Sequence, residues 1–160
     1  MKTSILSVFL VSLALLPTCG KPDAGPTTVM PNGEPSRVKV QHCLIAFQDA
    51  VGFRERGGPP EKARARSRDE AQKLAGEILT KAKAGEDFAK LVEQFTDDSA
   101  PGIYGMVNDG APTHQDFSPR KGMAKAFGDV SFKLKVGEID TTSYHRDESP
   151  FGWHIIKRLE

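Results

Sequence analysis

The chain has 160 residues, with 22 basic and 21 acidic side chains and a formal net charge of +1 at pH 7. This near balance argues against a nucleic-acid partner, which would need a strongly basic surface. A hydrophobic content of 38% with 27% charged residues is typical of one soluble domain with a single core.

The first eighteen residues have the pattern of a signal peptide. Lys2 precedes the uncharged run ILSVFLVSLALL at residues 5–16, which has the length of a signal-peptide core and is too short for a transmembrane helix. A buried N-terminal strand or helix is the alternative. No other segment is long and apolar enough to span a bilayer, so we expect an exported, non-integral mature protein.

The following letters, LLPTCG, resemble the lipobox of bacterial lipoproteins. The resemblance implies that Cys19 becomes the lipidated first residue, anchored in a membrane and facing the periplasm or the outside. Soluble export is the alternative. The only other cysteine, Cys43, lies in a predicted strand, so we expect a buried apolar residue and no disulfide framework.

Residues 19–36 are predicted to be a flexible linker, and residues 37–160 the folded domain. Residues 20–36 hold four prolines and three glycines in seventeen positions, a composition typical of a tether. A disordered tail without a spacer role is the alternative.

The domain begins with a predicted strand, VKVQHCLIAF, at residues 38–47. Its alternation puts His42 on one face with Val40 and Leu44, and Cys43 on the other. From this strand alone, His42 is a hydrogen-bonded core histidine. A polar loop follows at residues 48–66, broken by Gly57-Gly58-Pro59-Pro60 and rich in arginine and lysine, which is either functional or a solvated insertion.

Two helices come next. Ser67-x-x-Glu70 is a capping box that starts the first, and Gly85 ends it. The second is predicted from about Glu86 to Phe95, where phenylalanine, leucine and valine make an apolar stripe.

The rest of the chain alternates between loop and regular structure. Residues 99–122 are predicted to be loop with a short strand at 104–107, residues 123–134 a helix, residues 136–139 a turn into a strand, and residues 152–159 the last strand. Strands at both ends of the order β-α-α-(β)-α-β-β predict an antiparallel sheet flanked by helices, an α+β fold.

Four segments in this order resemble the parvulin family of peptidyl-prolyl cis/trans isomerases. They are VKVQHCLI, RSRDEAQKLAGEILTKAKAGEDFAKLVEQFTDDSA, KGMAKAFGDVSFKLKVGEI and FGWHIIKRLE, which together cover about Val38 to Glu160. The resemblance implies an α+β fold with a four-stranded antiparallel sheet surrounded by about four helices (β-α3-β-α-β2). It also implies a proline pocket on the concave face of the sheet.

The resemblance assigns roles to individual residues. His42 and His154 match the two histidines that lie side by side at the centre of the parvulin sheet. Asp98, the second aspartate of FTDD, matches a position near the substrate amide. We expect these three residues to form the catalytic centre through position and electrostatics, with no nucleophile or proton shuttle.

The resemblance also implies that Met123 and Phe127, four residues apart on a predicted helix, form the proline pocket. From the sequence alone, ordinary core packing of these two residues is the alternative. Tyr104 takes the place of a leucine that usually lines this pocket in parvulins. Phosphate-directed parvulins carry a basic loop between their first strand and first helix, and here Arg54 and Arg56 occupy a similar place. Recognition of an acidic residue before proline is therefore a further hypothesis.

The expected function is isomerisation of X–Pro bonds in unfolded or proline-containing polypeptides, with no cofactor and no metal. A parvulin-fold holdase chaperone or binding module with little isomerase activity is the alternative. Two other hypotheses have less support. The first is a metal site at His42, His154 and Asp98, which lack a close-spaced metal-ligand motif. The second is a thiol hydrolase that uses Cys43, which as a strand neighbour of His42 should point to the opposite face.

Overall fold

The computed structural model describes residues 27–113 and 115–160. The predicted signal peptide, Cys19 and the first part of the predicted linker therefore lie outside the described residues. Within the described part of the chain, no helix is long and apolar enough to cross a membrane.

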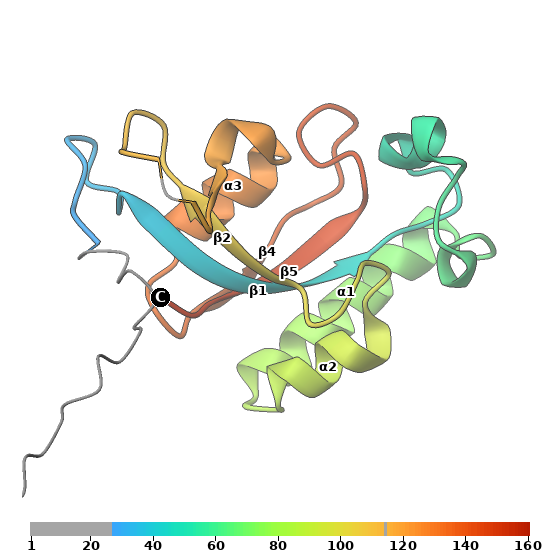
Figure 1. Cartoon of the computed structure of the whole chain (residues 1–160). Coiled ribbons are helices and arrows are strands. Elements are labelled where there is room, and N and C mark those ends of the chain that lie inside the picture. Colours follow the sequence, from blue (N-terminus) through green and yellow to red (C-terminus); the bar gives the residue numbers. More distant parts are fainter. Residues whose placement is uncertain (1–26, 114) are drawn as a thin grey trace, which may run out of the picture.

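The centre of the fold is a curved sheet with the strand order β3-β2-β1-β5-β4 (Figure 1). Strand β1 (Arg37–Ile45) pairs antiparallel with β2 (Ile103–Val107) and with β5 (Trp153–Arg158), and β5 pairs antiparallel with β4 (Ile139–Thr141). These are the four expected antiparallel strands, and the α+β fold is confirmed. A fifth, two-residue strand, β3 (Ser118–Pro119), adds a parallel pair at the edge.

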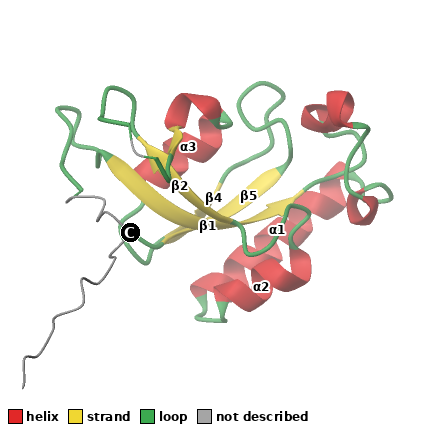
Figure 2. Ribbon diagram, in the orientation of Figure 1, coloured by secondary structure: helices red, strands yellow, loops and turns green. Residues whose placement is uncertain are grey.

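Helices cover both faces of this sheet. Helices α1 (Arg68–Lys83) and α2 (Phe88–Phe95) pack on the convex face, and α3 (Lys125–Lys133) lies over the concave face (Figures 1 and 2). The core is accordingly divided into two clusters. The larger one packs on α1 and α2 and includes Cys43, and the smaller one packs around Phe127 and Phe132 of α3.

The first helix begins where the sequence predicts. The Ser67 hydroxyl accepts from the Glu70 backbone N–H, and the Glu70 carboxylate accepts from the Ser67 N–H, which completes the capping box. Gly85 follows the helix with φ of 94°, the left-handed conformation expected after a C-terminus. The second helix begins at Phe88 because the Asp87 carboxylate caps it, accepting from the N–H groups of Ala89 and Lys90.

Two predicted segments differ from the structure. The loop at 48–66 contains two 3-10 helices, Val51–Arg56 and Glu61–Ala63, because the apolar residues Phe53 and Ala63 are buried in the larger core cluster. The helix predicted from residue 123 begins at Lys125. A 3-10 turn, Arg120–Gly122, ends at Met123, whose backbone is extended, so Met123 and Phe127 do not share a helix.

Two glycines let neighbouring segments approach β1 closely. Gly102 has φ of 65° and Gly152 has φ of 141°. A Cβ atom on Gly102 would overlap the carbonyl oxygen of His42, and one on Gly152 would overlap that of Ile45. Both positions require glycine.

Candidate functional site

The histidines of the first and last strands meet because of the β1–β5 register. His42 lies opposite Ile156, and His154 lies opposite Leu44, so the histidines are diagonal neighbours on one face of the sheet. Their Nδ1 atoms are 3.2 Å apart, and the residues are only 3% and 6% exposed. The predicted proximity of His42 and His154 is therefore present.

Asp98 reaches the same face from the segment that follows α2. The Thr96 hydroxyl accepts from the Leu44 N–H at 3.1 Å and from the Asp98 N–H at 3.2 Å. The buried Asp97 carboxylate accepts from the Ala46 N–H and pairs with Arg66. These contacts fix the TDD segment against β1 and so determine where Asp98 lies. No pattern in the sequence predicted the part played by Arg66.

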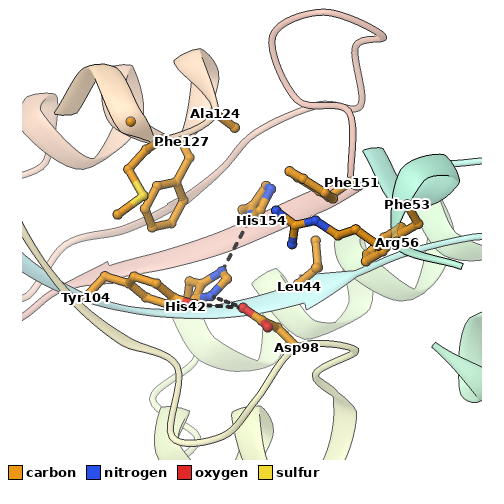
Figure 3. Close-up of a pocket in the computed structure, with 12 residues that line it drawn as sticks. His42, Leu44, Phe53, Arg56, Asp98, Tyr104, Ala124, Phe127, Phe151 and His154 are labelled. Atoms are coloured by element: carbon orange, nitrogen blue, oxygen red, sulfur yellow. Dashed lines mark hydrogen bonds and ion pairs between the residues drawn. The ribbon is translucent and has the colours of Figure 1, made fainter. Parts of the chain in front are cut away.

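The Asp98 carboxylate is held by two donors. Its Oδ2 lies 3.2 Å from Nε2 of His42 and accepts from the Tyr104 hydroxyl at 3.0 Å (Figure 3). The hydrogen bond from His42 has the largest effect on the carboxyl group and, with that from Tyr104, holds the pKa of Asp98 well below its usual range. Burial and the neighbouring Asp98 raise the pKa of Tyr104 to about 12. At neutral pH the site therefore contains a carboxylate and a protonated tyrosine.

His154 is uncharged. Burial, reinforced by repulsion from His42, lowers the pKa of His154 from 6.5 to about 3. The 3.2 Å contact between the Nδ1 atoms places the N–H of one ring opposite the lone pair of the other. The Nε2 atom of His154 is buried without a partner among the described residues.

Two buried hydroxyl groups that the sequence did not single out fix the His154 backbone. The Thr142 hydroxyl accepts from the His154 N–H at 3.0 Å and lies 3.2 Å from the Ser149 hydroxyl. Ser149 donates in turn to the carbonyl of Gly152 at 2.8 Å. Because both residues come from the loop between β4 and β5, only the folded chain reveals this support.

A pocket of about 240 Å³ lies above the histidines on the concave side of the sheet (Figure 3). Its walls are mainly apolar, and the lining residues are His42, Leu44, Phe53, Arg56, Asp98, Tyr104, Gly122, Met123, Ala124, Phe127, Phe151 and His154. The ring of Phe127 stands edge-on to His42 at 5.1 Å and is 5.3 Å from His154. All six residues predicted for the catalytic centre and the proline pocket are therefore brought together.

The two predicted arginines differ in position. Arg56 lines the pocket, and its guanidinium lies 4.9 Å from the ring centroid of Phe151 and points toward the site (Figure 3). Arg54 is exposed and does not line the pocket. Phe53 and Phe151 form an edge-to-face pair at 5.1 Å, an aromatic wall that the sequence did not predict.

The described residues do not have the geometry of a metal site or of a reactive thiol at Cys43. Over residues 27–113 and 115–160, no group of three or more histidine, cysteine, aspartate or glutamate side chains is arranged to hold a metal ion. Cys43 belongs to the core cluster on the α1 and α2 side, and burial raises the pKa of its thiol to about 12. Such a thiol is protonated and unreactive at neutral pH. The arrangement instead suits an apolar ring held beside a fixed negative charge.

Comparison with known proteins identifies the family. The sequence profile of the PPIC-type PPIase domain matches residues 28–160, most of the chain. The chain belongs to this family. The resemblance to parvulin-type peptidyl-prolyl isomerases is thereby confirmed.

Individual relatives carry names that refer to protein folding. Foldase protein PrsA of Geobacillus sp. (strain WCH70) is 42% identical over 89 residues, covering 54% of this chain and 27% of that protein. The parvulin-like PPIase of Rickettsia prowazekii is 35% identical over 94 residues (56% and 29%). Chaperone SurA of Nitrosospira multiformis is 32% identical over 122 residues (76% and 22%). The chain thus spans under a third of the length of each of these relatives.

A solved structure agrees on the fold. The solution structure of TbPIN1 is similar with a TM-score of 0.57 and 20% sequence identity, covering 78% of this chain and 98% of that one. At this identity the likeness shows a shared architecture.

The neutral state of His154 predicts acid destabilisation in a defined pH range. Unfolded His154 takes up a proton as the pH falls through 6.5, whereas the folded residue resists protonation down to about 3. Stability should therefore fall with pH between these values, with a slope of up to ~1.4 kcal/mol per pH unit for one proton.

Denaturant unfolding at pH 7, 6 and 5 measures this slope. In His154→Leu the free energy of unfolding should fall less steeply with decreasing pH, by up to ~1.4 kcal/mol per pH unit. The matched control is His145→Asn, which replaces an exposed histidine. Equal slopes in the wild type and His154→Leu would contradict the neutral buried imidazole.

Proposed function

We propose that this chain catalyses cis/trans isomerisation of X–Pro bonds in unfolded exported or envelope proteins. The observation that carries the proposal is the apolar pocket bounded by Met123 and Phe127, directly above a hydrogen-bonded Asp98–His42–His154 network. A pocket of this kind accepts a proline ring, and the network puts a fixed charge beside it.

The reaction breaks no bond and needs no cofactor. Rotation about an X–Pro amide is opposed by its partial double-bond character, with a barrier of about 18–20 kcal/mol. Spontaneous exchange takes roughly tens to hundreds of seconds. A catalyst must therefore bind the twisted amide more tightly than either planar form.

The proposed roles follow from charge and position. Met123 and Phe127 hold the proline ring, so that the carbonyl side of the bond rotates. In the planar amide the carbonyl oxygen carries partial negative charge, which rotation reduces. The Asp98 carboxylate near that oxygen disfavours the charge-separated planar form and so lowers the barrier. His42, supported by His154, keeps Asp98 ionised and in place.

Two variants separate binding from rotation. Met123→Ala should raise KM, because it removes part of the ring pocket, and Asp98→Ala should lower kcat. We expect a change of about 10-fold in kcat/KM for each, equivalent to ~1.4 kcal/mol. Isomerisation of X–Pro tetrapeptides measures both, with the exposed Lys90→Ala as control.

The second candidate function is a holdase chaperone, which the similarity to Chaperone SurA over 122 residues supports. Wild-type protein that gives no rate above the uncatalysed background would rule out the isomerase proposal. Suppression of client aggregation by the same preparation would then support the holdase. Aggregation suppression alongside isomerisation would indicate that one pocket serves both activities.

A finer proposal concerns the residue before proline. Arg56 extends from a 3-10 helix into the pocket at the end opposite Phe127 (Figure 3). Its guanidinium is stacked on Phe151, which limits its orientation. We therefore assign to Arg56 a preference for an acidic residue preceding proline.

Arg56→Ala should lower kcat/KM for Glu–Pro peptides by about 3- to 10-fold and spare Ala–Pro peptides, because a partly exposed charge pair is lost. Arg54→Ala is the matched control, since Arg54 lies two residues before Arg56 in the same 3-10 helix and does not line the pocket. The Arg56 effect should shrink at high salt. Equal losses on both peptides would contradict charge recognition.

Lipid anchoring remains a proposal based on the LLPTCG segment. After removal of residues 1–18, acylated Cys19 would hold the protein at a membrane surface through its buried acyl chains. The intact mass of mature protein from a bacterial membrane fraction should equal residues 19–160 plus the lipid. Cys19→Ala should move the protein to the soluble fraction; an unmodified Cys19 in mature wild-type protein would disprove the anchor.

A further inference from the structure

The described residues that precede β1 are folded against the domain. The Met30 N–H donates to the Glu34 carbonyl at 2.7 Å, and the Ser36 N–H donates to the Thr28 carbonyl at 2.7 Å. Gly33, with φ of 81°, allows the chain to reverse between them. The result is a closed turn over residues 28–36, which we call the N-terminal turn.

The N-terminal turn presents one acidic side chain to the domain. The Glu34 carboxylate accepts from Nη1 of Arg120 at 2.7 Å and from Nδ2 of Asn108 at 3.1 Å. The two charged side chains are 20% and 16% exposed, so water screens the pair much less than it would a surface ion pair. Asn108 also accepts from Nη1 of Arg120 and donates to the Pro35 carbonyl.

The same arginine is fixed to helix α3. Nη2 of Arg120 donates to Asp129 at 2.7 Å, and the guanidinium lies 4.7 Å from the ring centroid of Phe132. The stem of Arg120 passes over Gly128, where a Cβ atom would come within 3.1 Å of its Cγ. Arg120 therefore joins the N-terminal turn to the helix that carries Phe127.

The backbone of Arg120 controls the other pocket wall. Arg120 begins the 3-10 turn Arg120–Gly122, and its carbonyl accepts the Met123 N–H at 2.9 Å. Met123 is partly buried and precedes α3, so it lies outside the hydrogen-bonded turns of that helix. Besides packing on the Phe127 core cluster, Met123 is held by this backbone bond to Arg120.

We propose that Glu34 is a positioning residue for the proline pocket, because its contact with Arg120 fixes Met123 relative to Phe127. The proposal rests on the proposed isomerase function of that pocket. The N-terminal turn lies outside the sheet, and about ninety residues separate it from Met123 in the chain. The proposal assigns this turn a role in shaping the site.

The kinetic test uses the full chain and four variants. Glu34→Gln removes the charge and keeps the shape, Arg120→Lys removes the fork of donors, and the double variant combines them. Asp140→Asn is the matched control, because it removes an exposed ion pair with Lys83, 3.7 Å long, on the far side of the sheet.

Glu34→Gln should raise KM for X–Pro tetrapeptides by about 3- to 10-fold and change kcat less than about twofold, because ring binding is lost while Asp98 is untouched. The two single substitutions should be less than additive in the double variant, since they act on one contact. Asp140→Asn should match the wild type. An unchanged KM in Glu34→Gln overturns the proposal. So does a loss of rate with KM unchanged, because a smaller folded fraction lowers only the apparent kcat.

Amide hydrogen exchange tests the positioning without relying on activity. Exchange of the Met123 N–H should be faster in Glu34→Gln than in Asp140→Asn, while the His42 N–H, bonded to the Gly102 carbonyl in the centre of the fold, should not change. Equal exchange at Met123 in the two variants overturns the proposal. If the wild type shows no isomerisation, the proposed function fails, and the exchange result alone decides whether Glu34 positions Met123.

Discussion

The register between β1 and β5 is the constraint on which the rest of the site depends. A shift of one residue in this pairing would send His42 and His154 to opposite faces of the sheet. The observed pairing sets His42 opposite Ile156 and Leu44 opposite His154, which brings the Nδ1 atoms to 3.2 Å. Gly152 and the Thr142–Ser149 hydroxyl pair support that register at the start of β5.

His154 and Asp98, the two neighbours of His42, have different charge states. His154 is neutral at its buried position, and Asp98 is ionised at the edge of the pocket. The two environments differ because His154 is almost completely buried, whereas Asp98 keeps two side-chain hydrogen-bond donors and partial exposure. A negative group with a fixed position beside an apolar ring pocket is well suited to a reaction that changes only the charge distribution of an amide.

The site is also supported from outside the sheet. Arg66 and Asp97 fix the segment that carries Asp98, and Arg120 links the N-terminal turn to both walls of the proline pocket. Each arginine is largely buried, and each has one acidic partner from a distant part of the chain, Asp97 for Arg66 and Glu34 for Arg120. These partly buried ion pairs serve position more than stability, because the cost of removing the charges from water offsets much of their attraction.

Much of the fold was predictable because its signals are local. The capping box at Ser67, the glycine after α1 and the alternation along β1 each depend on neighbouring residues, and all are present in the structure. The parvulin resemblance supplied the candidate residues His42, Asp98 and His154. Element boundaries were less accurate, since Met123 and Phe127 have helical spacing but come from two different elements.

What only the tertiary structure decided is the set of contacts between distant segments. It placed Arg56 at the pocket and Arg54 outside it, because one face of a 3-10 helix packs Phe53 into the core. It also joined Glu34 to Arg120, a pairing across 86 residues that no local pattern encodes. The sequence by itself determined the elements, the family and the polar residues of the site, since these follow from neighbouring side chains and ordered motifs. Strand register and long-range ion pairs determined how those residues meet, and these exist only once the chain has folded.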